Sequence, residues 1–333
     1  MNEGTNGKSS PLAAAARRVF GIREINILLV LVALSAAIYS QKAAFLSDYN
    51  VRIVLKDFSV FALLAIGETL VILTGGIDLS PGAVVALTGF VAAYGMDKGL
   101  SMPAAIGLAL LLALAIGYTH GLFVTKLGVA PFIITLGTFI IARAAAALPT
   151  HGTPISNLPD GFASIAGAYV GPIPLPAIIM GIFAVAAILI TQCTVLGRDI
   201  YAIGGNIEAA RLAGVNVDRR RTFCYMASAL LAGVAGIVVA SRCMLGDPGV
   251  GTNYELTAIS AVVIGGASLM GGEGTIFGTL LGGAIMSVLT NGFILLRVDA
   301  YWQPVCIGAV VVIAVTLDSV RRKRKRSLRA TAT

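Results

Sequence analysis

Charged side chains that could take part in chemistry are rare in the middle of this sequence, and Glu68 is the clearest of them. It lies in an apolar segment that runs from Phe58 to Leu73, with ten uncharged residues before it and nine after it. An ionisable group in such a segment is costly and is by default a functional candidate. Two interpretations stay open: a carboxylate that hydrogen-bonds a neighbouring helix, or a polar group on a translocation path.

Asp78 is the second candidate, and it lies in a turn-forming sequence. Gly75 and Gly76 precede it, and Ser80 and Pro81 follow it. This order predicts a tight turn, with Asp78 or Ser80 capping a helix that begins near Pro81.

Two further polar residues, Arg143 and Asn291, lie in other apolar segments and are candidates of the same kind. The cation of Arg143 could reach the membrane surface along its aliphatic stem, or it could pair with a carboxylate such as Glu68. The sequence does not choose between these two positions.

Glycine is too dense between Val262 and Thr275 for a continuous helix. A non-helical backbone at membrane depth is tolerated only where protein or water covers it. We therefore expect a break or a re-entrant turn, comparable to the glycine turn before Asp78. The glycines assigned to the two breaks are Gly75, Gly76, Gly265, Gly266, Gly271 and Gly272.

Metal, redox and ATP chemistry are not expected of this chain. The two histidines, His120 and His151, are isolated, and the four cysteines form no CxxC pair. No G-x-x-x-x-G-K-[ST] phosphate loop occurs. We therefore predict no cofactor and no metal, and any use of ATP would need a separate ATPase subunit.

The composition indicates what must position these residues. The chain has 333 residues, of which 57% are apolar and 12% charged, against about 25% charged in an average soluble domain. Its mean hydropathy is +0.90. An all-α polytopic membrane protein with about ten spans and broken glycine-rich segments is predicted. The spans are expected near Ile25–Tyr39, Phe58–Leu73, Pro81–Gly95, Pro103–Val124, Pro131–Leu148, Ile173–Val195, Thr222–Ala240, Leu256–Ala267, Thr275–Leu296 and Pro304–Leu317.

The distribution of Lys and Arg predicts the orientation. With a cytoplasmic N-terminus, seventeen of them lie inside and six outside, with Arg143 left in a span. Both termini are therefore expected in the cytoplasm. The division is a tail at 1–24, one transmembrane domain at 25–317 and a basic tail at 318–333. The last tail is interpreted as an anchor on anionic lipid, and no nucleic-acid partner is expected.

The longest cytoplasmic loop contains a short predicted helix, Ile207–Ala213. Asn206 suits its N-cap, and Gly214 suits the left-handed residue after its end. Its apolar side would be formed by Ile207, Ala210 and Leu212, with Ala209 beside them and Glu208 and Arg211 at the rim. Two roles stay open: a connector lying on the membrane surface, or a plug that enters a groove of a partner.

Several motifs resemble the ribose-type permeases of ABC sugar importers. The two longest are GETLVILTGGIDLS at 67–80 and NIEAARLAGV at 206–215, with further matches at PFIITLGT (131–138), Ile259–Gly278 and Asn291-Gly292. The resemblance covers about residues 50 to 317. Pro81 stands where the family commonly has Val, and Arg297 where Gly is common, which bears on the substrate and leaves the fold unchanged.

This resemblance implies a vitamin-B12-importer-like permease in the inner or plasma membrane. A second permease subunit, two cytoplasmic ATPase subunits and an extracytoplasmic sugar-binding protein would be its partners, and Glu208–Gly214 would be the coupling helix. A branched-chain amino acid permease is the near alternative, since that family shares the architecture. An ion-coupled secondary transporter would need more carboxylates at mid-membrane than Glu68, and an embedded enzyme would need paired acids or a histidine cluster.

Overall fold

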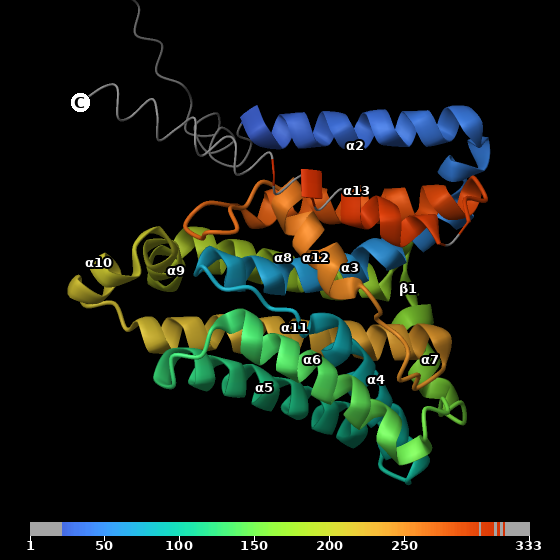
Figure 1. Ribbon diagram of the computed structural model, residues 1–333. Coiled ribbons are helices and arrows are strands. Elements are labelled where there is room, and N and C mark those ends of the chain that lie inside the picture. Colours follow the sequence, from blue (N-terminus) through green and yellow to red (C-terminus); the bar gives the residue numbers. More distant parts are fainter. Residues whose placement is uncertain (1–21, 300, 310–311, 314–315, 317–333) are drawn as a thin grey trace, which may run out of the picture.

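The computed structural model describes residues 22–299, 301–309, 312–313 and 316 (Figure 1). Within these ranges the fold is almost entirely helical. Of the predicted tails at 1–24 and 318–333, residues 1–21 and 318–333 lie outside the described residues. The helices are α2 (Ile22–Gln41), α3 (Asp48–Leu73), α4 (Pro81–Asp97), α5 (Met102–Lys126), α6 (Pro131–Ala147), α7 (Asp160–Gly167), α8 (Leu175–Cys193), α9 (Val195–Gly205), α10 (Ile207–Leu212), α11 (Val217–Cys243), α12 (Tyr254–Ile264) and α13 (Ile276–Leu295).

Three kinds of smaller element complete the described chain. Two 3-10 turns, η1 (Ala43–Leu46) and η2 (Leu148–Thr150), extend helix ends. Strands β1 (Tyr169–Val170) and β2 (Ile173–Pro174) form an antiparallel hairpin in which Val170 faces Ile173. Residues 302–309 are helical as well, where the last span is predicted.

Six helices in the described part of the chain are long and apolar enough to cross a membrane: α2, α5, α6, α8, α11 and α13. Helix α3 has 26 residues, but its last 18 include Lys56, Asp57 and Glu68. Helices α4 and α12 are shorter, with 17 and 11 residues. The chain is therefore an all-α polytopic membrane protein.

Helices α3 and α11 form the centre of the bundle. Every residue of α3 from Ser59 to Leu73 is buried, and α11 packs against α3, α4 and α5. Helix α13 lies between α3 and the outer helix α2, while α5 lies on the opposite side of α11 (Figure 1). The core is thus built around two central helices that carry few large polar groups.

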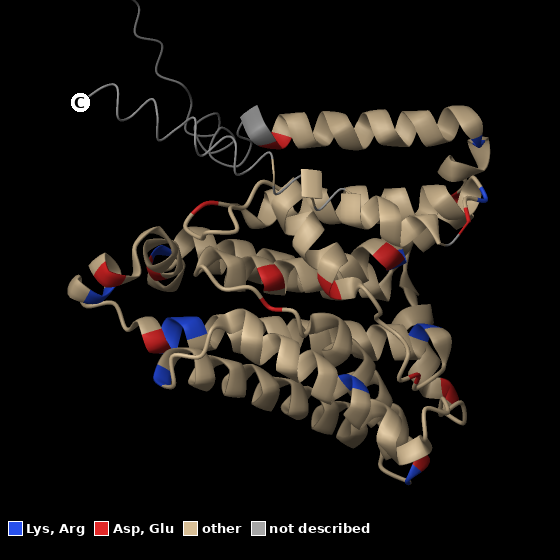
Figure 2. Cartoon of the chain, viewed as in Figure 1, with Lys and Arg blue, Asp and Glu red and all other residues tan. Residues whose placement is uncertain are grey.

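The two ends of the bundle differ in structure. Helices α9 and α10 lie at one end, and α7 and the β1–β2 hairpin lie at the other (Figure 1). Charged side chains gather at these two ends and leave a largely uncharged belt between them (Figure 2). This distribution is the one that a membrane imposes, because charges are expensive in its hydrocarbon layer.

Glycine brings α5 directly against α11. A Cβ atom added at Gly117 would lie 2.6 Å from the Cα atom of Met226, and one added at Gly121 would lie 2.6 Å from the Cα atom of Thr222. Small residues at helix contacts allow backbones to approach closely in membranes. One glycine on the same helix, Gly107, has no neighbouring atom within 4 Å of such a Cβ and serves as a control.

We expect Gly117→Val to push α5 away from α11, because the backbone of Met226 cannot move aside as a flexible side chain could. Overpacking of this kind costs about 1–3 kcal/mol. The thermal unfolding temperature of the purified chain in detergent should fall, whereas Gly107→Val should leave it nearly unchanged. Equal unfolding temperatures for the two variants would contradict the close contact.

Candidate functional site

Glu68 and Asp78 lie together in the interior, at a break in the helical structure. Helix α3 ends at Leu73, and α4 begins at Pro81. Between them the chain is non-helical, and its backbone groups need partners. The Asp78 amide donates a hydrogen bond to Oε1 of Glu68 at 3.2 Å. Both side chains are fully buried, so Glu68 supplies an acceptor to the broken backbone beside it.

The carboxylate of Asp78 bonds both to its own turn and to α11. Its Oδ1 atom accepts from the amide of Ser80 at 2.9 Å and from the hydroxyl of Ser80 at 2.6 Å. Its Oδ2 atom accepts from the hydroxyl of Ser228 at 3.1 Å. Neither predicted cap of α4 is formed. Ser80 makes no side-chain cap bond, and the carboxylate of Asp78 accepts from Ser80 and Ser228 and not from an amide in the first turn of α4.

The close approach of α3 and α11 explains this bond. A Cβ atom at Gly67 would lie 2.8 Å from the Cα atom of Ser228, so this glycine lets α11 pass directly against α3. Tyr225, one turn earlier on α11, is also buried and contacts Gly76. Sequence analysis missed Ser228 and Tyr225, although their i, i+3 spacing places them on one face of α11.

His120 extends this polar cluster toward α5 and α6. Its Nε2 atom lies 2.8 Å from the hydroxyl of Thr138, and its ring meets the ring of Tyr225 edge-on at 6.0 Å between centroids. Within the part of the chain that is described, Glu68 Oε2, His120 Nδ1 and the Tyr225 hydroxyl have no hydrogen-bond partner. No group of three His, Cys, Asp or Glu side chains that could hold a metal occurs there.

Arg143 lies apart from Glu68 and binds main-chain oxygens instead. Its guanidinium donates to the carbonyl of Val250 at 2.6 Å and to that of Pro248 at 3.4 Å. Both carbonyls belong to the loop between α11 and α12. The pairing with Glu68 that the sequence left open is therefore not made, because the guanidinium binds these loop carbonyls instead.

Asn291 pairs with a residue far away in the sequence. Its amide nitrogen donates to Oδ1 of Asn50 at 2.9 Å, and the Asn50 amide donates to Oδ1 of Asn291 at 3.0 Å. This reciprocal pair is buried and joins α13 to the beginning of α3. Asn50 also donates to the carbonyl of Phe45 at 2.9 Å, so these bonds link η1, the beginning of α3 and α13.

The two glycine-rich breaks meet a third glycine pair, at the end of α9. We call this contact the glycine junction. It is formed by Gly75, Gly204, Gly205, Gly271 and Gly272. A Cβ atom at Gly271 would lie 2.8 Å from the Gly75 amide nitrogen and 2.9 Å from the Gly204 Cα atom. Gly75 and Gly271 have φ angles of 77° and 90°, which L side chains rarely adopt. Backbone therefore packs on backbone here.

Hydrogen bonds hold the glycine junction. The Gly272 amide donates to the carbonyl of Leu73 at the end of α3, at 3.0 Å. The Tyr201 hydroxyl of α9 donates to the carbonyl of Gly274 at 2.8 Å. Burial raises the pKa of the Tyr201 phenol, so it stays protonated and remains a donor. An ion pair of 2.8 Å between Arg220 and Asp199 ties α9 to α11 as well.

Helix α10 projects beyond this junction (Figure 1). The Asn206 side chain accepts from the amides of Glu208 and Ala209, at 3.0 Å each, and Gly214 follows with a φ of 84°. Both helix ends are thus fixed. Glu208 and Arg211 form an exposed ion pair of 3.4 Å.

The predicted apolar side of this helix is divided in the structure. Ala210 is buried and Ile207 is partly buried, and both pack against Ile203 and Val217. Leu212 points the other way and is 90% exposed. The sequence predicted one apolar side for Ile207, Ala210 and Leu212. In so short a helix, the face that is buried depends on where α9 and α11 lie, which the local sequence does not show.

Comparisons with known proteins agree on one family. Residues 50–315 match the family model described as branched-chain amino acid transport system / permease component. Ribose import permease protein RbsC of Haemophilus influenzae is 40% identical, with 91% of this chain and 94% of that protein covered. RbsC of Bacillus subtilis is 41% identical over 83% and 86%. The D-allose permease AlsC of Escherichia coli is 36% identical over 84% and 86%. No solved structure matches the chain.

We expect Glu68→Gln to fold, because the amide oxygen of Gln can still accept from the Asp78 amide. Glu68→Leu leaves that buried amide unpaired, which costs about 1–3 kcal/mol. Thermal unfolding of the purified chain in detergent, together with transport by the assembled system, checks both variants. Wild-type stability and transport in the Leu variant would show that the carboxylate is dispensable.

Proposed function

The chain belongs to the family described as branched-chain amino acid transport system / permease component, and we propose that it is the membrane-spanning permease subunit of an ATP-driven ABC importer of a sugar. The observation that carries the proposal is identity of about two fifths over nearly the whole chain with ribose import permeases. Relatives named for xylose and D-allose are also similar. Sugar is therefore favoured over the branched-chain amino acids in the family description.

The proposed partners follow from what the chain itself contains. Its sequence has no phosphate loop, so two cytoplasmic ATPase subunits would hydrolyse ATP. An extracytoplasmic binding protein would deliver the sugar, and a second permease subunit would complete the path. The carboxylates of Glu68 and Asp78 bond within this subunit, which supports a structural role for both and gives no support to ion coupling.

For the membrane arrangement we propose ten spans, a vitamin-B12-importer-like architecture and cytoplasmic termini. The end of the bundle that carries α9 and α10 would face the cytoplasm. Lys126, Arg211 and the three arginines at 219–221 belong to this end, as the excess of positive charge in cytoplasmic loops requires.

Helix α10 is the proposed contact with the ATPase. Its exposed face carries Leu212 and Ala209 between the charges of Glu208 and Arg211. An exposed i, i+3 pair contributes only about 0.2–0.5 kcal/mol to the helix itself. A leucine that is almost fully exposed contributes little to the free energy of folding, but it would contribute to the free energy of binding if a partner's groove buried it. Through Ile203 and the glycine junction, a movement of α10 would reach the end of α3 and the break between α12 and α13.

We expect Leu212→Asp to weaken ATPase binding at least tenfold, because an interface concentrates its free energy in a few buried residues. Glu208→Lys combined with Ala209→Asp should uncouple ATP hydrolysis from uptake. Folding should be unaffected, since these side chains are exposed. Co-purification of the ATPase with the permease measures the effect.

A matched control is Leu127→Asp, at an exposed leucine of the same end of the bundle but outside α10. It should retain the ATPase. Full co-purification by the Leu212 variant, or an equal loss in both variants, would make α10 a mere connector.

The transport proposal is tested with the permease, its ATPase and its binding protein in membrane vesicles. Uptake of labelled ribose, xylose or allose should require ATP and the binding protein, and a protonophore should not reduce it. A thermal-shift screen of the binding protein identifies which sugar to use. Uptake that needs an ion gradient, or a binding protein that holds only leucine, isoleucine or valine, would overturn it.

A further inference from the structure

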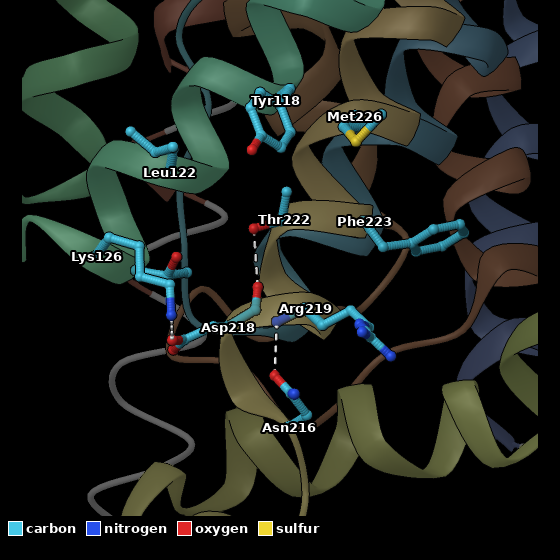
Figure 3. Close-up of a pocket in the computed structure, with 10 residues that line it drawn as sticks. Tyr118, Leu122, Lys126, Asn216, Asp218, Arg219, Thr222, Phe223 and Met226 are labelled. Atoms are coloured by element: carbon cyan, nitrogen blue, oxygen red, sulfur yellow. Dashed lines mark hydrogen bonds and ion pairs between the residues drawn. The ribbon is translucent and has the colours of Figure 1, made fainter.

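A groove runs along α11 from its first residues to the middle of the helix. At the end near α10, a cavity of about 450 Å³ lies between α5 and α11, and Lys126 and Arg219 line it (Figure 3). A second cavity, of about 310 Å³, continues between α5, α8 and α11 over α3. Phe223 and Met226 line both cavities. We call the combined feature the α11 groove.

The two halves of the α11 groove differ in chemistry. The half near Lys126 contains polar side chains, including Asn216, Asp218 and Thr222. The other half is lined only by apolar residues, such as Leu70, Phe183 and Leu231. From Asn216 to Leu231 the helix rises about 22 Å at 1.5 Å per residue, which compares with about 15 Å for half of a bilayer's hydrocarbon layer. The groove is therefore about as long as one lipid leaflet, with the apolar half along the acyl chains and the polar half at the headgroups.

The polar half has spare positive charge. Lys126 donates to Asp218 at 2.7 Å (Figure 3), but an ammonium group has three donors and can bind a second anion. Asn216 accepts the backbone amide of Arg219. The guanidinium of Arg219 has no ion pair within the described ranges of the chain. Lys126 and Arg219 line opposite sides of this half of the groove, with their side chains pointing apart (Figure 3), so a lipid headgroup between them would meet a cation on either side.

We propose that the α11 groove binds one anionic phospholipid, with its headgroup at the end that Lys126 and Arg219 line and an acyl chain along the apolar half. A second copy of this chain is disfavoured as the occupant, because one end of the groove offers cations and the rest offers no hydrogen-bonding group. Bulk lipid would fill the apolar half as well, but it would not select an anionic headgroup. The lipid would brace α5, α8 and α11 beside the loop that carries α10.

The test uses the purified full chain in detergent and native mass spectrometry. Dioleoyl phosphatidylglycerol and dioleoyl phosphatidylcholine share their acyl chains, so a comparison isolates the headgroup. One phosphatidylglycerol should bind at least tenfold more tightly than phosphatidylcholine. Lys126→Gln with Arg219→Gln should reduce this preference to less than threefold. Asp218→Asn, which frees Lys126, should bind phosphatidylglycerol at least as tightly as the natural chain.

Two controls separate the groove from the rest of the surface. Arg52→Gln with Lys98→Gln removes two cations outside the groove and should keep the full preference. Ala186→Trp places a large ring in the apolar half and should reduce binding of either lipid, whereas Val185→Trp, exposed on the same helix but outside the groove lining, should not.

Equal affinity for the two lipids in the natural chain, or an unchanged preference in the Lys126 and Arg219 variant, would overturn the proposal. So would an equal effect of the two tryptophan variants. A monodisperse peak in size-exclusion chromatography confirms that each variant is folded before lipid is added. None of these readouts depends on sugar transport, so the result stands apart from that of the uptake experiment.

Discussion

Backbone groups that lose their helical partners inside a membrane must find others within the protein, and this requirement governs the interior of the chain. The break between α3 and α4 takes its partners from Glu68, which accepts the Asp78 amide, and the break between α12 and α13 takes Leu73, which accepts the Gly272 amide. Helix α3 thus supplies a hydrogen-bond acceptor to both broken segments. Buried polar groups carry little net stability but are costly to leave unpaired.

Glycine allows the α3–α4 break, the end of α9 and the α12–α13 break to meet at backbone contact distance. Gly204 and Gly271 contact the backbone on either side, and no side chain would fit between them. As a consequence, α9 is linked through Tyr201 and Gly204 to the end of α3 and to the break between α12 and α13. The projecting α10 is therefore attached to the broken helices by rigid contacts, which is the arrangement needed for a partner at one end of the bundle to affect its interior.

Polar side chains in the bundle serve mainly as local partners. Asn50 and Asn291 satisfy each other across α3 and α13, and Arg143 satisfies loop carbonyls near the far end. At the α10 end, Leu212 is 90% exposed, and the exposed Arg219 has no ion pair within the described residues. This exposure fits the proposed ATPase contact at Leu212 and the proposed lipid contact at Arg219.

The sequence by itself determined the membrane class, the positions of the long helices and the caps of α10, because apolar length, charge and cap residues act over a few neighbouring positions. It also singled out Glu68 and Asp78, since a charge in an apolar run is conspicuous. Only the tertiary structure decided their partners. Ser228 lies 150 residues from Asp78, and which face of α11 meets α3 depends on Gly67. The inward turn of Ile207 and the outward turn of Leu212 were likewise settled by packing against Ile203 and Val217, which short-range patterns do not contain.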